Sequence, residues 1–267
     1  MNLTRLKAAA CAVALSAMAL VTGAGAAHAQ ATAGPVYVAL GDSYSSGVGA
    51  GGYDDASGDC HRTSRAYPAL WAGAHAAAGF SFTACSGART GDVLNNQLGP
   101  LNAATSLVSI TIGGNDAGFS DVMTICVQPG ESNCLSRIAE ARAFVRDILP
   151  GRLDQVYSAV TSRAPAAHVA VLGYPRFYRL SGSCTFGLTE TERAAINDAS
   201  DFLNSVIAQR AAAHGFAFGN VAAAFSGHEI CSDDEWLHSV ALPVYESYHP
   251  TAAGQSGGYL PVLESVD

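Results

Sequence analysis

Two residues far apart in the sequence have the types needed for nucleophilic catalysis. Ser43 belongs to the triplet Gly41-Asp42-Ser43, and His249 precedes Pro250 near the end of the chain. A serine hydroxyl is a weak nucleophile at its own pKa, so it needs a base to take its proton as it attacks a carbonyl carbon. The pair therefore predicts attack on an ester, provided that the fold brings the two side chains together.

Two short motifs offer hydrogen-bond donors for the negative oxygen that such an attack creates. Gly87 lies in Ser86-Gly87-Ala88, and Asn115 lies in Gly113-Gly114-Asn115-Asp116. A glycine allows close approach to the backbone, and an asparagine amide can donate to an oxyanion. Taken alone, the asparagine motif is better explained as an ordinary turn, and Gly87 can be explained as a loop glycine. Taken together with Ser43 and His249, they predict a catalytic site.

The elements that must position these residues alternate between strand and helix. Near-continuous apolar runs predict buried strands at residues 36–40, 80–84, 107–112, 169–172 and 216–221. Helical spacing predicts helices at residues 66–77, 134–163, 189–214 and from 251 onward. This alternation indicates an α/β fold, with a parallel sheet between two layers of helices. Ser43, Gly87 and Asn115 follow predicted strands, at the end of the sheet where such folds place their chemistry, and His249 precedes the last predicted helix.

The start of the chain has the pattern of a secretory signal peptide. Arg5 and Lys7 precede an apolar run over residues 8–21, and Ala27-His28-Ala29 fits the small-residue cleavage rule, as do positions a few residues later. A retained membrane anchor is the alternative, but glycines interrupt the run too early for one. We therefore expect removal of residues 1–29 and a single domain over residues 30–267 in a secreted, extracellular protein.

Charge excludes several classes of function. The chain has 14 Lys and Arg residues against 22 Asp and Glu residues, and no basic run, so we expect no nucleic-acid partner. Lys7 is the only lysine, which leaves residues 30–267 with 12 arginines and a net charge of −10. Mechanisms that need a lysine, such as a P-loop or a Schiff base, are therefore excluded for the mature chain.

Six cysteines follow residue 29, an even number that suits disulfide formation in an oxidising compartment. No C-x-x-C or H-E-x-x-H spacing is present, so we expect no metal site and no cofactor. Of the many pairings that six cysteines allow, their grouping along the sequence favours neighbours: Cys60 with Cys85, Cys126 with Cys134, and Cys184 with Cys231.

The motifs together resemble the SGNH or GDSL hydrolases, especially their secreted actinobacterial lipases, esterases and phospholipases. The four blocks stand in the family's order. The resemblance implies that Ser43 is the nucleophile, that His249 is the base, and that Ser43, Gly87 and Asn115 form the oxyanion hole. It spans the chain after the signal peptide. It also implies a three-layer α/β/α sandwich with a flavodoxin-like, five-stranded parallel sheet.

Two positions depart from the family pattern. Tyr44 follows Ser43 where the family name has leucine, a trivial change, and Glu246 stands three residues before His249 where the family has aspartate. Some secreted members that resemble this chain orient the histidine through a backbone carbonyl instead. Either Glu246 or the carbonyl of Ser247 is therefore the expected acceptor for His249.

The function implied by the resemblance is that of an extracellular serine ester hydrolase: a lipase, an esterase or a phospholipase A1. We expect an acyl lipid or another ester as substrate, transient contact with a lipid interface, and a monomer. Because anionic bilayers repel an anionic protein, that contact should be apolar and tolerate salt. The alternatives are a carbohydrate O-acetyl esterase and a non-catalytic binding module on the same scaffold. Aromatic candidates for the wall of an acyl pocket are Tyr44, Tyr53, Phe119, Tyr174, Phe177, Tyr178 and Tyr248.

Overall fold

A computed structural model of the chain describes residues 34–181, 184 and 187–267. The expected signal peptide, residues 1–29, lies outside the described residues. From residue 34 onward the described chain belongs to one compact unit. Within these ranges, no helix combines the length and the apolar character needed to cross a membrane.

A parallel five-stranded sheet forms the middle of the molecule, with strand order β2-β1-β3-β4-β5. The five predicted strands are confirmed, with ends displaced by at most two residues. The three central strands are almost entirely buried, which explains their continuous apolar sequences. The strands are β1 (Val36–Gly41), β2 (Gly79–Phe82), β3 (Leu107–Thr111), β4 (His168–Leu172) and β5 (Ala217–Gly219).

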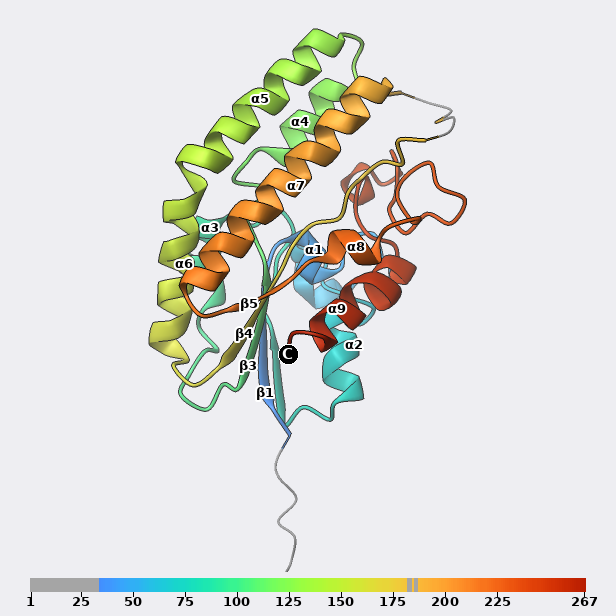
Figure 1. Cartoon of the computed structure of the whole chain (residues 1–267). Helices are drawn as coiled ribbons and strands as arrows, with labels where there is room; N and C mark the ends of the chain where they lie inside the picture. The colour runs from blue at the N-terminus through green and yellow to red at the C-terminus, as the bar shows by residue number, and fades with distance from the viewer. Residues whose placement is uncertain (1–33, 182–183, 185–186) are drawn as a thin grey trace, which may run out of the picture. The chain divides into compact units, whose positions relative to one another are not determined.

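Helices cover both faces of the sheet, so the predicted α/β/α sandwich is confirmed (Figure 1). One layer contains α3 (Thr90–Asp92), α5 (Glu131–Asp147), α6 (Leu149–Arg163) and α7 (Glu190–Ala213). The other layer contains α2 (Tyr67–Ala74), α8 (Val221–Ala224) and α9 (Leu260–Glu264). Short helices α1 (Ser43–Ser46) and α4 (Phe119–Cys126) follow β1 and β3. Single-turn segments complete the described helices: η1 (Asp55–Cys60), η2 (Val93–Gln97), η3 (Val244–Glu246) and η4 (Gly254–Tyr259).

Two predicted helices differ from those in the structure. The predicted helix at residues 134–163 is two helices, α5 and α6, which meet at Ile148. Pro150 explains the break, because a proline lacks the N–H of a helix interior and its ring clashes with the carbonyl four residues earlier. The last predicted helix, from residue 251, begins with the wider turns of η4 and becomes α-helical only at Leu260.

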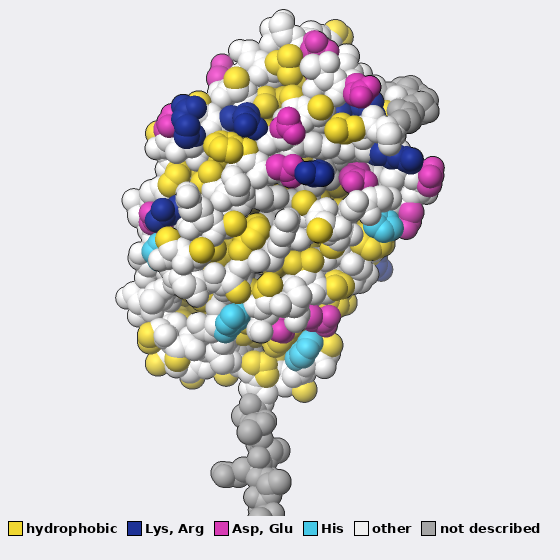
Figure 2. All heavy atoms as spheres, in the orientation of Figure 1, with side chains coloured by type: hydrophobic (Ala, Val, Ile, Leu, Met, Phe, Trp, Pro, Cys, Tyr) yellow, Lys and Arg dark blue, Asp and Glu magenta, His cyan; other side chains and the backbone are white. Residues whose placement is uncertain are grey.

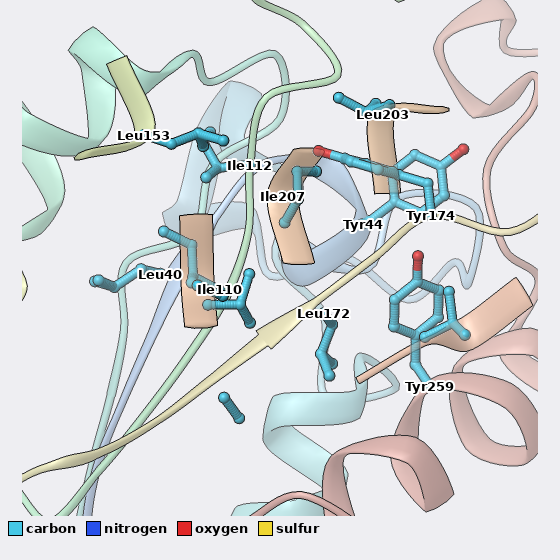
Figure 3. Close-up of a cluster of buried hydrophobic side chains, with 14 of the residues drawn as sticks. Leu40, Tyr44, Ile110, Ile112, Leu153, Leu172, Tyr174, Leu203, Ile207 and Tyr259 are labelled. Carbon is cyan, nitrogen blue, oxygen red and sulfur yellow. The ribbon is translucent and has the colours of Figure 1, made fainter. Parts of the chain in front are cut away.

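The hydrophobic core lies between the sheet and its two helical layers. Leu40 and Ile110 of the central strands belong to one buried cluster with Leu153 of α6 and Ile207 of α7 (Figure 3). Each of these four side chains is fully shielded from solvent. Burial of this apolar surface is the main driving force that holds the helices on the sheet.

Three disulfides join the neighbouring cysteines, as predicted from their grouping in the sequence. Cys60–Cys85 ties the end of η1 to the loop that follows β2, and Cys126–Cys134 ties α4 to α5. Cys184–Cys231 joins the segment after β4 to the segment after α8. Each bridge therefore fixes a connection between elements.

Candidate active site

Ser43 is presented by a tight turn at the carboxyl end of β1. Gly41 has a φ of +123°, and a Cβ at this position would lie 2.4 Å from the carbonyl oxygen of Thr111, so only glycine fits. Asp42 then caps α1, because its side chain accepts from the N–H of Tyr44 at 3.0 Å. The turn places the Ser43 hydroxyl at the sheet edge where parallel strands end.

The side chains of Ser43 and His249 meet although 206 residues separate them in the sequence. Ser43 Oγ lies 2.7 Å from His249 Nε2, and His249 Nδ1 lies 2.9 Å from the carbonyl oxygen of Ser247. A carbonyl can only accept, so Nδ1 must carry the ring proton and Nε2 presents its lone pair to the serine hydroxyl. This tautomer is the one that a general base requires.

The two sequence-based candidates for the acceptor of His249 are now distinguished. Nδ1 of His249 bonds to the Ser247 carbonyl, whereas the Glu246 carboxylate accepts from the Tyr53 hydroxyl at 2.6 Å. Tyr53 in turn accepts from the N–H of Gly49 at 2.9 Å. Glu246 therefore holds the glycine-rich loop after α1 rather than His249.

Burial controls the charge of the histidine. Desolvation within the site lowers the pKa of His249 to about 4, and the hydrogen bond to the Ser247 carbonyl only partly opposes this effect. The imidazole is therefore neutral at neutral pH, which leaves Nε2 free to take a proton.

Asp42, adjacent to the serine, is a buried carboxyl group in a network of hydroxyls. Burial raises its pKa to about 6, although hydrogen bonds from Thr111, Tyr174 and the Tyr44 N–H favour the ionised form. The Tyr174 hydroxyl donates to Asp42 and accepts from the N–H of Gly114 at 3.1 Å. Tyr174 thus links the turn that carries Ser43 to the loop that carries Asn115. The sequence identified it only as a wall candidate.

Gly87 and Asn115 face the same pocket as Ser43 and His249. Gly87 has a φ of +75°, and a Cβ built on it would have no neighbour within 4 Å, so the space in front of its backbone is open. Asn115 Nδ2 donates to the carbonyl of Ala88 at 3.0 Å, which holds the two loops together and leaves its second amide hydrogen for another acceptor. The structure therefore brings all four predicted residues to one place.

An apolar pocket of about 210 Å³ extends from these residues between three helices. Figure 1 shows α4, α5 and α7 together at the end of the sheet where β1 and β3 finish. Eight apolar side chains that line the pocket come from these helices: Phe119, Val122, Met123, Ala141, Val145, Ile196, Ala199 and Leu203. Of these, only Phe119 was identified from the sequence. Val122 and Met123 were missed because α4 was not predicted, and the other five lie in predicted helices whose pocket-facing sides the sequence did not show.

The aromatic candidates divide into two groups. Those that line the pocket are Tyr44, Phe119, Tyr174 and Phe177. Tyr53 instead bonds to Glu246, whereas Tyr178 and Tyr248 belong to the buried core. The sequence could not separate these groups, because aromatic residues serve both as core and as pocket wall.

No metal site stands out in the described chain, and no basic patch stands out on the face shown in Figure 2. Among its residues, no group of three or more His, Cys, Asp or Glu side chains could hold a metal ion. On the face shown in Figure 2, arginines lie singly among acidic and apolar side chains.

Comparison with known proteins identifies the family. The model of the GDSL-like lipase/acylhydrolase family matches residues 39–256, which include all four candidate positions. The chain belongs to this family. The resemblance inferred from the motifs is therefore confirmed.

Several similar proteins are lipases by name. The chain is 63% identical to a lipase from Streptomyces rimosus over the full length of both, and 65% identical to lipase 1 from Streptomyces coelicolor over 94% of each. A crystal structure of the extracellular lipase from Streptomyces rimosus is 66% identical with a TM-score of 0.86, covering 87% of this chain and 100% of that one. A crystal structure of phospholipase A1 from Streptomyces albidoflavus is 68% identical with the same TM-score, covering 88% and 100%.

Proposed function

We propose that this member of the GDSL-like family is an extracellular lipase that transfers the acyl group of a lipid ester to Ser43 and then to water. The observation that carries the proposal is the 2.7 Å contact between Ser43 Oγ and Nε2 of His249, at one end of an apolar pocket. The protein is a carboxylic ester hydrolase, in agreement with its close relatives named lipase and phospholipase A1.

The reaction follows from the positions of the two side chains. Ser43 Oγ attacks the ester carbonyl carbon while its proton passes to Nε2 of His249. The tetrahedral intermediate collapses as His249 returns the proton to the departing alcohol, and an acyl-enzyme remains on Ser43. A water molecule then attacks the acyl carbon, His249 takes its proton, and the acid and free Ser43 are released. The Ser247 carbonyl faces Nδ1–H and stabilises the transient imidazolium.

Three donors would stabilise the oxyanion of the tetrahedral intermediate: the N–H groups of Ser43 and Gly87 and the side-chain amide of Asn115. Among the described residues, neither of these N–H groups donates to a protein acceptor. Asn115 has a second amide hydrogen beyond the one given to Ala88. Donors held in place before the reaction need no reorganisation when the charge develops, which is why they are effective.

The lining of the pocket supports an acyl chain as the bound group. Its walls between α4, α5 and α7 are largely aliphatic and aromatic, and burial of a hydrocarbon chain against them is favourable. An acetylated carbohydrate would need polar partners there. A lipid ester is therefore the substrate we propose, with a glycerolipid head group outside the pocket.

Export and domain organisation complete the proposal. We propose a signal peptide at residues 1–29 and a monomeric domain over residues 30–267. The three disulfides suit an oxidising compartment, and the similar lipase from Streptomyces rimosus is described as extracellular.

The test is hydrolysis of p-nitrophenyl esters from acetate to palmitate by residues 30–267. We expect the highest activity at medium or long chains, and we expect Ser43→Ala to lower kcat by on the order of 10⁴-fold or more. Ser256→Ala is the matched control, because Ser256 is an exposed serine in a G-x-S-x-G sequence outside the site, and it should leave kcat unchanged.

Three other results would contradict the proposal. Activity on acetate alone would favour the carbohydrate O-acetyl esterase, and a folded protein without activity on any ester would favour the binding module. Full activity in Ser43→Ala would remove Ser43 from the mechanism.

A further inference from the structure

Four exposed apolar side chains are concentrated in one short segment next to the candidate site. Val240, Leu242, Val244 and Tyr245 are 66%, 88%, 69% and 41% exposed. They are half of the large apolar side chains exposed in the described chain, yet they lie within residues 240–245, which we call the apolar loop. Isolated exposed apolar residues need no explanation, but a cluster of this kind marks a contact surface.

The apolar loop is held in a defined conformation. The Ala241 N–H donates to the Ser247 hydroxyl at 2.9 Å, so the serine side chain closes the base of the loop. Just after the loop, the N–H groups of Glu246 and Ser247 donate back to the carbonyls of Pro243 and Val244 within it, both at 3.0 Å. The exposed side chains are therefore presented by a fixed turn, and contact with another surface needs little further ordering.

The loop borders the opening of the acyl pocket. Tyr245 is 41% exposed and also lines the pocket, while its other face stacks on the ring of His61 at 4.2 Å. The same segment continues to Ser247, whose carbonyl orients His249. A surface that contacts the apolar loop thus lies directly at the entrance through which an acyl chain must pass.

Charge limits the kind of surface that the apolar loop can bind. Glu246 is the only charged residue within residues 239–248, and its carboxylate is already bonded to the Tyr53 hydroxyl. The chain after residue 29 has a net charge of −10, so an anionic membrane would repel it, and the loop offers no cation to offset that repulsion. The surface that fits is apolar and uncharged or zwitterionic.

We propose that the apolar loop docks the protein on the surface of neutral lipid aggregates and brings the pocket entrance to the lipid. This inference rests on the proposed function, because it assigns the surface on which that reaction takes place. A second copy of the chain fits less well, since a protein seated on the loop would cover the entrance to the pocket.

The test compares two triple variants of residues 30–267, the same chain used for the ester series. The loop variant carries Val240→Ser, Leu242→Ser and Val244→Ser, and it leaves the pocket-lining Tyr245 intact. The control carries Val127→Ser, Ile148→Ser and Leu180→Ser, three side chains with 43%, 48% and 40% exposure elsewhere on the surface. Binding to phosphatidylcholine vesicles is measured by flotation, with Ser43→Ala added to each protein so that the lipid is not hydrolysed. Hydrolysis is measured with Ser43 intact, on vesicles and on soluble p-nitrophenyl butyrate.

We expect the loop variant to bind vesicles about tenfold or more weakly, since it loses the apolar surface that would be buried in lipid. Its hydrolysis of vesicle lipid should fall in parallel, while hydrolysis of the soluble ester stays within about twofold, which also shows that the variant is folded. The control triple should bind like the parent, and 1 M salt should not release either protein.

The proposal fails if the loop variant binds vesicles like the parent, if the control loses as much binding, or if salt abolishes binding. It also fails if the loop substitutions change the oligomeric state instead of vesicle binding. These results differ from failure of the proposed function, in which the parent protein would hydrolyse neither the soluble ester nor the vesicle lipid.

Discussion

A backbone carbonyl performs, at His249, the orienting role that a carboxylate performs in a catalytic triad. The Ser247 carbonyl fixes the tautomer through a 2.9 Å bond to Nδ1, but it brings no negative charge into the site. Because burial is then not balanced by an anion, the pKa of His249 falls to about 4. The histidine stays a neutral base even in mildly acidic conditions.

Residue types predicted that Ser43 and His249 would meet, but they could not predict which group accepts from His249. Ser43, Asn115 and His249 are informative because few side chains can do their chemistry, and Gly87 is informative because a glycine leaves its backbone accessible. Every residue has a carbonyl, however, so nothing in the sequence distinguishes the carbonyl of Ser247 from any other. Glu246 was an equally good candidate until the structure placed its carboxylate on Tyr53.

Asn115 offers a test at this scale. We predict that Asn115→Ala lowers kcat by about 10²- to 10³-fold with a much smaller change in KM, because an oxyanion donor acts on the transition state rather than on the bound ester. Steady-state kinetics on p-nitrophenyl octanoate would measure both constants. Asn96→Ala is the matched control, since Asn96 is an exposed asparagine outside the pocket. A rise in KM at constant kcat would assign Asn115 to substrate binding instead.

Among the elements, the strands were easier to predict than the helices that form the pocket. Buried parallel strands are continuous apolar runs, and all five were found. Helix α4 was missed because it has only eight residues, follows a glycine-rich turn, and is stabilised by packing and by the Cys126–Cys134 bridge rather than by its own sequence. The space between α5 and α7, where the acyl chain would lie, depends on how the two helices pack in the folded protein.

The helix α7 allows the size of the pocket to be tested. We predict that Ala199→Phe shifts the preferred ester from long to short acyl chains, with activity on palmitate reduced about tenfold or more relative to butyrate, because the added ring occupies space that the chain would fill. The p-nitrophenyl ester series measures the shift. Ala212→Phe places the same ring on the exposed face of this helix and should leave the profile unchanged. An unaltered profile in Ala199→Phe would place the acyl chain elsewhere.

At the scale of the whole molecule, Asp42 couples the site to global stability. Burial raises its pKa from 3.8 to about 6. Below about pH 4 the carboxyl is neutral in both the folded and the unfolded chain, whereas above about pH 6 the folded chain must hold a buried charge. Its favourable contribution is therefore complete at low pH and is lost as the pH rises through 6.

Asp42→Asn should remove this pH dependence. Between about pH 4 and pH 7, we predict that the free energy of unfolding of the parent falls by about 2 kcal/mol relative to that of the variant. Denaturant unfolding at several pH values measures the difference. Asn96→Ala alters no titratable group, so its difference from the parent should not vary with pH. A constant difference for Asp42→Asn would show that the carboxyl titrates alike in both states.

The grouping of the cysteines in the sequence predicted the disulfides of the whole molecule, whereas the shape of the pocket could not be predicted. The pairing of Cys60 with Cys85 and of Cys184 with Cys231 follows from sequence proximity, because loop closure is entropically cheaper over short separations. The shape of the pocket depends on which faces of the helices pack together, and these contacts between distant residues cannot be predicted from the pattern of a single sequence.

Both ends of the described domain lie at the end of the sheet where the strands begin, opposite the pocket. Strand β1 begins there at Val36. The carbonyl of Val266 bonds to His168, the first residue of β4, and the side-chain carboxylate of Asp267 accepts from the Trp71 ring N–H. A carrier protein or a solid support joined to either end would therefore leave the pocket and the apolar loop facing outward. Linking the two ends to each other, with new ends opened in a surface loop, would likewise spare the catalytic side. The topology thus suits oriented immobilisation and circular permutation.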